Sequence, residues 1–293
     1  MPELPEVETV RRSLLPYLPG RVIEDALVRH PKVLVFPDPG TFARQLRGAR
    51  FERLERRGKL LIFHLPPLVL LVHLGMTGQL TFRDPSRSDR PFERHPTTGL
   101  QRTVQHEVDS HTHITLLFGD GCAVHYRDIR KFGKWRLFSQ DHPRLGLELA
   151  RLGPDPLTSD WQWEPFFRTV RGSQRAIKAI LLDQAVAAGV GNIYADEALF
   201  EAGVRPAIKG AKLSARRIGK IFSAVPSVLA KALANGGTSF SDYVDADGKK
   251  GSNQEQLLVY GRYGEPCFRC QNELERSTVA QRTSTWCKVC QRT

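Results

Sequence analysis

The stretch CFRCQNELERSTVAQRTSTWCKVC, residues 267–290, decides how the carboxyl-terminal part of the chain folds. It holds two Cys-x-x-Cys pairs with sixteen residues between them. Two such knuckles place four thiolates tetrahedrally around Zn²⁺ and leave no open position for a substrate. A tail this short cannot build its own core, so metal binding supplies its folding energy. The sequence therefore predicts one structural zinc ion per chain, held by Cys267, Cys270, Cys287 and Cys290.

Polar residues lie between the two knuckles, among them Arg276, Gln281 and Arg282. A basic side chain on a rigid zinc hairpin is a natural phosphate ligand, but an ordinary solvated arginine fits the pattern equally well. The fifth cysteine, Cys122, lies far from this segment, and we expect a buried structural thiol there.

Charge and length describe the rest of the protein. The chain has 293 residues, which suggests two domains or one large one, and 41% of them are hydrophobic, enough for a real core. Its 43 Lys and Arg against 31 Asp and Glu give a net charge of +12. This excess favours nucleic acid as the partner over an acidic membrane surface, and it also fits a basic enzyme with a solvated surface.

Neither a membrane span nor a secretory signal is expected. The most apolar stretch, residues 60–74, is interrupted by His64, Pro66, Pro67 and His73, and falls short of the roughly 20 apolar residues that a spanning helix needs. The first twelve residues hold three Glu and two Pro where a signal would place basic and then apolar residues. We therefore expect a cytosolic protein with reduced cysteines.

The first half of the chain is predicted to be mostly β. Apolar spacing indicates one helix at residues 5–18, begun by Pro5. Strands are expected at 22–29, 50–65, 68–74, 78–83, 113–118, 122–126 and 134–138, with turns at Gly58, at Pro66-Pro67 and at residues 119–121. Residues 84–112 are polar and show no apolar period, so they are interpreted as a long mobile loop.

The second half is predicted to be mostly helical. We expect a helix at 173–188, capped by Ser173 and ended by Gly189. A second helix should begin with Asn192 as its N-cap and end near Gly203. A third is expected at 214–234, where Pro226 should kink or split it. Residues 238–254 are predicted to form a loop.

The amino terminus offers a nucleophile. If Met1 is removed, Pro2 carries a free α-amine, whose ordinary pKa near 8 leaves roughly a tenth of it neutral at pH 7. A secondary amine can form an iminium, and Glu3 and Glu6 lie beside it in sequence as proton carriers. Taken alone, the three residues could equally be no more than the start of a helix.

Eight blocks of sequence, in order along nearly the whole chain, resemble the bacterial formamidopyrimidine-DNA glycosylases. They are PELPEVETVRR at 2–12, RRGKLL at 56–61, HLGMTG at 73–78, DIRKFG at 128–133, LLDQAVAAGVGNIYADEALFEAGVRP at 181–206, GGTSFSDYVDADGKKG at 236–251, VYGRYGEPC at 259–267 and AQRTSTWCKVC at 280–290. The related endonuclease VIII branch begins with Gly where this chain has Leu4, which favours the purine-lesion branch.

The resemblance implies an α+β multidomain fold with DNA in the cleft between domains. An N-terminal catalytic β-sandwich domain with flanking helices would take residues 1–140, and a helix–two-turn–helix DNA-binding domain residues 155–237. A lesion-covering loop would take 238–254 and a zinc-ribbon finger 255–293. We expect a monomer that binds double-stranded DNA containing an oxidised base or an abasic site and does not bind membranes.

The resemblance also implies an activity, namely excision of oxidised purines, including 8-oxoguanine and formamidopyrimidines, followed by strand cleavage through β,δ-elimination. Pro2 would be the nucleophile and Glu3 the general acid/base, supported by Glu6. The other catalytic positions implied are Lys59 and Arg282. The implied DNA-binding residues are Met76, His73, Arg130, Lys131, Phe132, Lys178, Asn192, Tyr194 and Arg282. Of these, Lys59, Asn192 and Arg282 would hold phosphates and Lys178 would lie near the lesion. Met76, Arg130 and Phe132 would fill the hole left by the extruded base, Arg130 also reading the orphaned cytosine.

Three features depart from the family pattern. Lys131 replaces the second arginine of an Arg-Arg-Phe triplet, which keeps the charge but loses forked hydrogen bonding. Ser252 and Asn253 stand where an aromatic pair is common, and segment 84–112 is longer than expected. Two alternatives therefore stay open. One is an endonuclease VIII-like glycosylase for oxidised pyrimidines. The other is a DNA-binding protein without catalysis, against which the joint presence of Pro2, Glu3 and Glu6 speaks.

Overall fold

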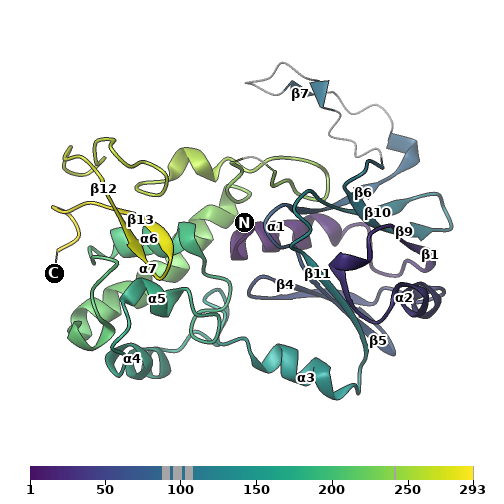
Figure 1. The fold of residues 1–293 in the computed structure, drawn as a ribbon, viewed down its shortest axis with the longest axis horizontal. Coiled ribbons are helices and arrows are strands. Elements are labelled where there is room, and N and C mark those ends of the chain that lie inside the picture. Colours follow the sequence, from purple (N-terminus) through teal and green to yellow (C-terminus); the bar gives the residue numbers. More distant parts are fainter. Residues whose placement is uncertain (88–92, 95–100, 103–107, 241, 293) are drawn as a thin grey trace. The chain divides into compact units, whose positions relative to one another are not determined.

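A computed structural model describes residues 1–87, 93–94, 101–102, 108–240 and 242–292 (Figure 1). Internal contacts divide the chain into two compact units. The first comprises Met1–Pro2, Glu6–Leu147 and Gly236–Gly251, and the second Glu3–Pro5, Glu148–Asn235 and Ser252–Thr293. The domain boundaries expected from the sequence stay predictions. The contacts place residues 3–5 with the second unit and residues 236–251 with the first.

The first unit is built on two sheets. The four-stranded sheet has the order β1-β9-β10-β6, made of β1 (Ile23–Val28), β9 (Thr112–Phe118), β10 (Ala123–Asp128) and β6 (Gly78–Arg83). The five-stranded sheet has the order β2-β11-β5-β4-β3, made of β2 (Leu34–Phe36), β11 (Lys134–Ser139), β5 (Leu68–His73), β4 (Leu60–Leu65) and β3 (Arg53–Arg57). Only β2 and β11 pair in parallel among these neighbours.

One apolar core joins side chains of both sheets, including Leu80 and Ile114 from one and Leu70 and Trp135 from the other. The predicted β-sandwich is thereby confirmed, and each of the predicted strand segments contains a strand. Helix α1 (Leu4–Leu14) confirms the predicted first helix, although it ends earlier than expected. Further described helices of the first unit are η1 (Pro31–Val33), α2 (Pro39–Leu46) and η2 (Pro85–Arg87), and α3 (Pro143–Ala150) begins in the first unit and ends in the second.

Helix α2 was not expected from the sequence, although its start signal is present. The Asp38 carboxylate accepts a hydrogen bond from the Thr41 N–H at 3.0 Å, and Pro39 follows at the first helical position. An aspartate cap before proline is a typical helix start. Phe42 and Leu46 then lie buried on one face of this helix.

The second unit is helical and ends in a small hairpin. Its helices are α4 (Trp163–Arg171), α5 (Ile177–Leu181), α6 (Asn192–Glu201), η3 (Gly210–Lys212), α7 (Ala215–Ala234) and η4 (Asn253–Gln256). Strands β12 (Glu275–Val279) and β13 (Arg282–Trp286) form the antiparallel hairpin. Helices α4, α5, α6 and α7 share one apolar core, to which they contribute Phe166, Ile180, Leu199 and Ile221 respectively.

The long helix predicted at 173–188 is wrong. Helix α5 covers only five residues, and two turns follow before α6. The reason is that other partners take the polar groups of this segment. The Gln184 amide donates to the carbonyls of Leu182 and Val190 and accepts from the Gly189 N–H, and the Gln184 carbonyl accepts from the Gly153 N–H. Tertiary hydrogen bonds therefore override a helical apolar period.

Pro226 does not split α7, which runs unbroken for 20 residues. A proline removes the hydrogen bond to the carbonyl four residues earlier, here that of Phe222. The Trp161 indole N–H donates to this carbonyl at 3.0 Å and replaces the missing donor. The helix begins close to the expected position, and the Ser214 side chain caps it by accepting from the Arg217 N–H.

Segment 84–112, interpreted above as a mobile loop, contains η2 (Pro85–Arg87) and two short paired strands, β7 (Glu93–Arg94) and β8 (Gln101–Arg102). The rest of that prediction, at 88–92, 95–100 and 103–107, lies outside the described residues. Among the residues that the structure does describe, no helix is both long and apolar enough to cross a membrane.

Candidate active site

The carboxylate of Glu3 lies at the start of α6 and is only 2% exposed. It accepts hydrogen bonds from the backbone N–H groups of Gly191 at 2.8 Å, Ile193 at 3.0 Å and Tyr194 at 3.3 Å. Asn192 is therefore not the N-cap that the sequence predicted. Gly191 occupies that position, Asn192 is the first helical residue, and an oxygen from a distant part of the chain supplies the cap.

Two glycines make room for this contact. A Cβ on Gly191 would lie 2.3 Å from the Glu3 Cδ, and a Cβ on Gly189, whose φ is +95°, would lie 2.6 Å from the Leu4 Cβ. The Leu4 N–H also donates to the Gly189 carbonyl at 3.0 Å. The Gly-Val-Gly sequence before α6 thus provides the surface against which Glu3 and Leu4 pack and hydrogen-bond. A side chain in either glycine position would displace the Glu3 carboxylate or its anchor.

Pro2 and Glu6 belong to the first unit. Pro2 is buried and follows Met1, so its nitrogen becomes an amine only when Met1 is removed. The Glu6 carboxylate, 1% exposed, accepts from the Thr238 N–H at 2.7 Å, and its backbone carbonyl accepts from the Tyr243 hydroxyl at 3.2 Å. Glu6 therefore holds the start of segment 236–251 against α1.

Further contacts fix the middle of the same segment. The Ser13 hydroxyl accepts from the Ala246 N–H at 2.9 Å, and the Phe82 N–H donates to the Ala246 carbonyl at 2.9 Å. The Tyr17 hydroxyl donates to Asp247 at 2.7 Å while its ring stacks on Phe82. The start and the middle of segment 236–251 are therefore both anchored. Phe240, which lies in the same segment, is 58% exposed.

Lys59 and His73 lie close together on the five-stranded sheet. Lys59 is in the turn between β3 and β4, and its neighbour Leu60 pairs with His73 at the end of β5. Burial, together with the positive charges of Lys59 and Arg136, lowers the pKa of His73 to about 4. The ring is therefore neutral at pH 7. Its Nδ1 accepts the Gly75 N–H at 3.0 Å, which leaves the proton on Nε2 as a donor.

Two neighbouring turns carry the residues expected to replace a flipped base. Met76, half-buried, lies in the turn between β5 and β6. Arg130, Lys131 and Phe132 lie between β10 and β11, where Lys131 has a φ of +58°. Arg130 and Phe132 are both exposed, and the Arg130 guanidinium lies 4.7 Å from the centre of the Phe132 ring. This cation–π pair forms an exposed tip.

Lys178 was expected near the lesion, and the structure places its ammonium in a fully buried ion pair. Its Nζ lies 2.8 Å from the Asp196 Oδ1 and donates to the Thr283 carbonyl at 2.9 Å and the Ser284 hydroxyl at 2.7 Å. Burial lowers the pKa of Lys178 and raises that of Asp196, and their mutual attraction partly offsets both effects. A direct DNA contact of Lys178 stays a prediction.

Asp196 was not singled out in the sequence. Its carboxylate also accepts from the Ser284 hydroxyl at 2.8 Å and the Thr285 N–H at 3.2 Å, so it ties the hairpin to α6. The Asn192 amide adds a bond to the Thr283 carbonyl at 3.1 Å. A single acidic residue inside a helix gives no sequence signal for such a contact.

Arg276 and Arg282, for which the sequence left phosphate binding and simple solvation as alternatives, lie on different strands of the hairpin. Ala280 and Gln281, with φ of +51° and +58°, connect β12 to β13, and Arg282 follows, exposed. Arg276 instead lies with its guanidinium 4.5 Å from the centre of the Tyr263 ring. Tyr194 is 1% exposed, and its backbone N–H donates to the Glu3 carboxylate.

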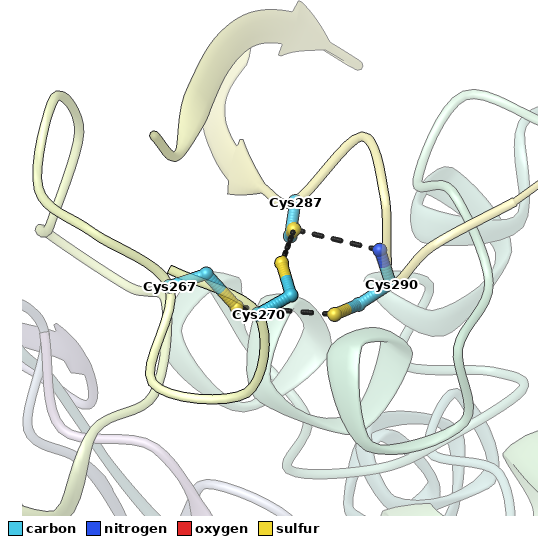
Figure 2. A group of neighbouring side chains, drawn as sticks. All are labelled: Cys267, Cys270, Cys287 and Cys290. Carbon is cyan, nitrogen blue, oxygen red and sulfur yellow. Dashed lines mark hydrogen bonds between the residues drawn. The ribbon is translucent and has the colours of Figure 1, made fainter. Parts of the chain in front are cut away.

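The four predicted zinc ligands meet in one cluster (Figure 2). Their sulfur atoms all lie within 4.8 Å of one another. The Cys267 and Cys290 sulfurs are 3.9 Å apart, and those of Cys270 and Cys287 3.5 Å. A tetrahedral site with Zn–S bonds of about 2.3 Å has edges of about 3.8 Å. The cluster therefore fits one structural zinc ion. Cys122 is not part of this cluster and is buried, as expected.

The β-sandwich, the α5–α6 pair joined by two turns and the four-cysteine hairpin define a zinc-ribbon protein of the helix–two-turn–helix class. Residues 1–135 match the formamidopyrimidine-DNA glycosylase N-terminal domain, and residues 152–244 match the H2TH domain of the same enzymes. The chain belongs to the formamidopyrimidine-DNA glycosylase family.

Named relatives match over the full length. The formamidopyrimidine-DNA glycosylase of Desulfitobacterium hafniense is 40% identical over 99% of this chain and 100% of its own. That of Geobacillus kaustophilus is 38% identical over 100% of both. Among solved structures, the MutM (Fpg) protein of Thermus thermophilus has a TM-score of 0.82 at 36% identity, covering 99% of this chain and 98% of its own. A Lactococcus lactis Fpg complex with abasic-site DNA has a TM-score of 0.86 at 33% identity, covering 99% and 100%.

Proposed function

We propose that this chain is a bifunctional DNA glycosylase and AP lyase of base excision repair. It excises oxidised purines, including 8-oxoguanine and formamidopyrimidines, and then nicks the strand by β,δ-elimination. Family membership supports this reaction, as do relatives solved in complex with abasic-site DNA and with Fapy-dG-containing DNA. The observation that carries it is the Glu3 carboxylate, next to the Pro2 nitrogen in the chain and held by three N–H groups of α6.

The chemistry follows from these two consecutive residues. The neutral Pro2 amine attacks the anomeric carbon of the damaged nucleotide, a nitrogen–carbon bond forms and the bond to the base breaks. Glu3 donates the proton that the departing fragment needs. The sugar ring then opens: the bond between the anomeric carbon and the ring oxygen breaks, that oxygen takes up a proton, and an iminium to the Pro2 nitrogen forms. The iminium acidifies C2′, whose proton is lost as the 3′ phosphate leaves. Loss of a second proton, from C4′, then expels the 5′ phosphate. Because both carboxylate oxygens are held from one side, Glu3 transfers protons from a fixed position.

The remaining site residues bind DNA in this proposal. Lys59, Asn192 and Arg282 hold phosphates, and Lys178 lies near the lesion, where its ammonium is paired with Asp196. His73, Lys131 and Tyr194 are the further DNA-binding positions of the proposal. Met76, Arg130 and Phe132 occupy the space of the extruded base. Residues 1–140 act as the catalytic domain, 155–237 as the DNA-binding domain, 238–254 as the lesion-covering loop and 255–293 as the zinc finger. The protein acts in the bacterial cytoplasm, on the DNA of the nucleoid.

Ser252 and Asn253 stand where an aromatic pair is common in the family, and for that reason oxidised pyrimidines were an alternative class of substrate. In the structure both residues have hydrogen-bond partners. The Ser252 N–H donates to the Asn235 carbonyl at 2.9 Å, and the buried Asn253 accepts from the Asn235 amide at 3.2 Å. Both residues therefore close the end of α7. This local role supplies a physical reason for the missing aromatic pair, so the purine-lesion reaction is the one we propose.

Borohydride trapping tests the proposal. A duplex with 8-oxoguanine opposite cytosine should become covalently linked to the wild-type chain, because borohydride reduces an iminium to a stable amine. Pro2→Gly should bind the duplex but lose most excision. A panel of duplexes with oxidised purines and pyrimidines gives the lesion preference. Full excision without any trapped product would contradict a Pro2 iminium, and preference for oxidised pyrimidines would favour the endonuclease VIII-like alternative.

A further inference from the structure

The two turns that carry Met76 and the Arg130–Phe132 tip are tied to one buried carboxylate. Asp128, the last residue of β10, is 0% exposed. Its Oδ1 accepts from the Thr77 hydroxyl at 2.6 Å, and its Oδ2 accepts from the Gly133 N–H at 2.8 Å and the Tyr126 hydroxyl at 3.0 Å. Asp128 therefore contacts the residue after Met76 and the residue after Phe132.

The same network reaches the backbone of Arg130. The Thr77 hydroxyl, while donating to Asp128, accepts from the Arg130 N–H at 3.1 Å. The Lys131 N–H donates to the Asp128 backbone carbonyl at 3.3 Å, and that carbonyl also meets the His113 Nε2 at 2.7 Å. Burial and the charge of Asp128 raise the pKa of Tyr126, so its hydroxyl remains a donor.

Close backbone packing adds to these hydrogen bonds. A Cβ on Gly75 would lie 2.4 Å from the Gly133 nitrogen, and a Cβ on Gly133 would lie 1.6 Å from the Tyr126 hydroxyl. The two turns therefore touch without side chains between them. Their separation is set by the Asp128 bonds and by direct backbone contact.

We propose that Asp128 is a positioning residue that holds Met76, Arg130 and Phe132 as one rigid wedge, and that discrimination of the base opposite the lesion depends on it. The proposal rests on the proposed function, which assigns these three residues to the space of the extruded base. Reading a base edge requires hydrogen bonds of narrow geometry, whereas filling the space with apolar atoms does not. If Met76, Arg130 and Phe132 are held less rigidly, discrimination of the base opposite the lesion is therefore lost before affinity for the duplex is.

The test compares Asp128→Asn with the wild type on two substrates. The first is an 8-oxoguanine duplex with cytosine or adenine opposite the lesion. The second is a single-stranded abasic oligonucleotide, which has no orphaned base. Asp128→Asn should reduce the cytosine preference about tenfold, as expected for a lost base-edge contact. Nicking of the single strand should stay at the wild-type rate, because that reaction needs no wedge.

A double variant separates positioning from general destabilisation. If Asp128 acts through Arg130, then Arg130→Ala should lower the cytosine preference in the wild-type background and have no further effect on it in Asp128→Asn. Thr77→Val, which removes one link between Asp128 and Arg130, should show a smaller loss, and it replaces Asp128→Asn if that variant does not fold.

Three outcomes would overturn the inference. They are an unchanged cytosine preference in folded Asp128→Asn and Thr77→Val, additive effects of Asp128→Asn and Arg130→Ala, or equal losses on the duplex and on the single strand. Failure of the proposed function is distinguishable, because in that case the wild-type chain itself neither excises the lesion nor nicks abasic DNA.

Discussion

In the proposed reaction, one side chain, Glu3, is structural and reactive together. Its carboxylate replaces a helix cap at α6, and the same hydrogen bonds fix its orientation at the start of that helix. A capping group has little freedom to move, which suits a proton carrier that must meet one substrate atom. The contact also makes the glycine before α6 as important as the glutamate.

Gly191→Ala should therefore impair the reaction without preventing folding. The new Cβ would lie 2.3 Å from the Glu3 Cδ and push the carboxylate off the helix start. We expect excision to fall by at least tenfold while lesion-duplex binding changes little, measured by single-turnover kinetics and by titration. Gly146→Ala is the matched control, since its Cβ meets nothing within 4 Å. Equal activity of the two variants would contradict the assigned role of Glu3.

Glu8 provides a pH-dependent stability term. Its burial alone would raise its pKa, but hydrogen bonds from Arg11 and Arg12 and the charges of Arg11 and Arg56 lower it from 4.5 to about 2. A folded pKa below the unfolded value stabilises the fold above pH 4.5, and this stabilisation is lost as the pH falls from 4.5 through 2. The free energy involved is on the order of 3 kcal/mol.

Urea unfolding at a series of pH values measures this effect. Between pH 5 and pH 3, Glu8→Gln should lose less stability than the wild type, because glutamine has no proton to gain. Glu24→Gln serves as a comparison at an exposed glutamate on the same unit. Parallel stability curves for the wild type and Glu8→Gln would show that the arginine cluster does not act as described.

At the scale of elements, the Lys178–Asp196 pair joins α5, α6 and the zinc hairpin. Lys178→Met leaves a buried carboxylate without its cation, so it should lower the free energy of unfolding of the second unit by about 3–5 kcal/mol. The double variant Lys178→Met/Asp196→Leu should recover much of this loss, because no unpaired charge remains. Chemical unfolding followed by tryptophan fluorescence checks both values. Additive losses would contradict a coupled pair.

Strands were predictable from the sequence where short apolar stretches lie between turn residues. Leu70 lies in such a stretch, in β5, where four consecutive residues are buried, and Trp135 lies in another, in β11. Helix α5 was overestimated because the amide of Gln184 binds backbone groups that a helix would use. No local pattern shows that the Trp161 indole compensates for Pro226, since the two residues are far apart in sequence.

The residues of the candidate site likewise divide into those that the sequence predicts and those that only the folded structure identifies. The four cysteines were readable from spacing alone, since zinc imposes that spacing. Pro2 and Glu3 became specific only through the resemblance of the surrounding blocks. Asp128 and Asp196 were missed, because a buried acid and a solvated one look alike in a sequence. Their partners, such as Gly133 and Thr285, are identified only when the chain has folded.

At the scale of the whole molecule, we expect zinc to connect the carboxyl-terminal hairpin to DNA binding. Cys287→Ser should release the metal and disorder the hairpin that carries Arg282 and the Thr283 carbonyl. DNA affinity should fall, and the slope of log affinity against log salt should flatten by about one unit through the loss of Arg282. Metal analysis and titrations at several salt concentrations measure both effects.

Arg282→Ala is the control that separates the metal from the arginine. It should flatten the salt slope to the same extent while the zinc content stays at one per chain. A folded, metal-free chain with unchanged DNA affinity would contradict the link between the hairpin and the interface.

The partner of Glu3 lies 188 residues further along the chain, at Gly191. The ribosome therefore synthesises the amino terminus long before it makes the helix that orients the Glu3 carboxylate. If Pro2 is the nucleophile proposed above, the nascent chain carries it during that interval without a positioned proton carrier. Contacts of such long sequence separation also slow folding, because the entropy of closing the long loop must be lost before they form. Under the proposed function, prematurely terminated products that lack residues 189–194 have no positioned Glu3, and competence to cut DNA arises only after most of the protein has been synthesised.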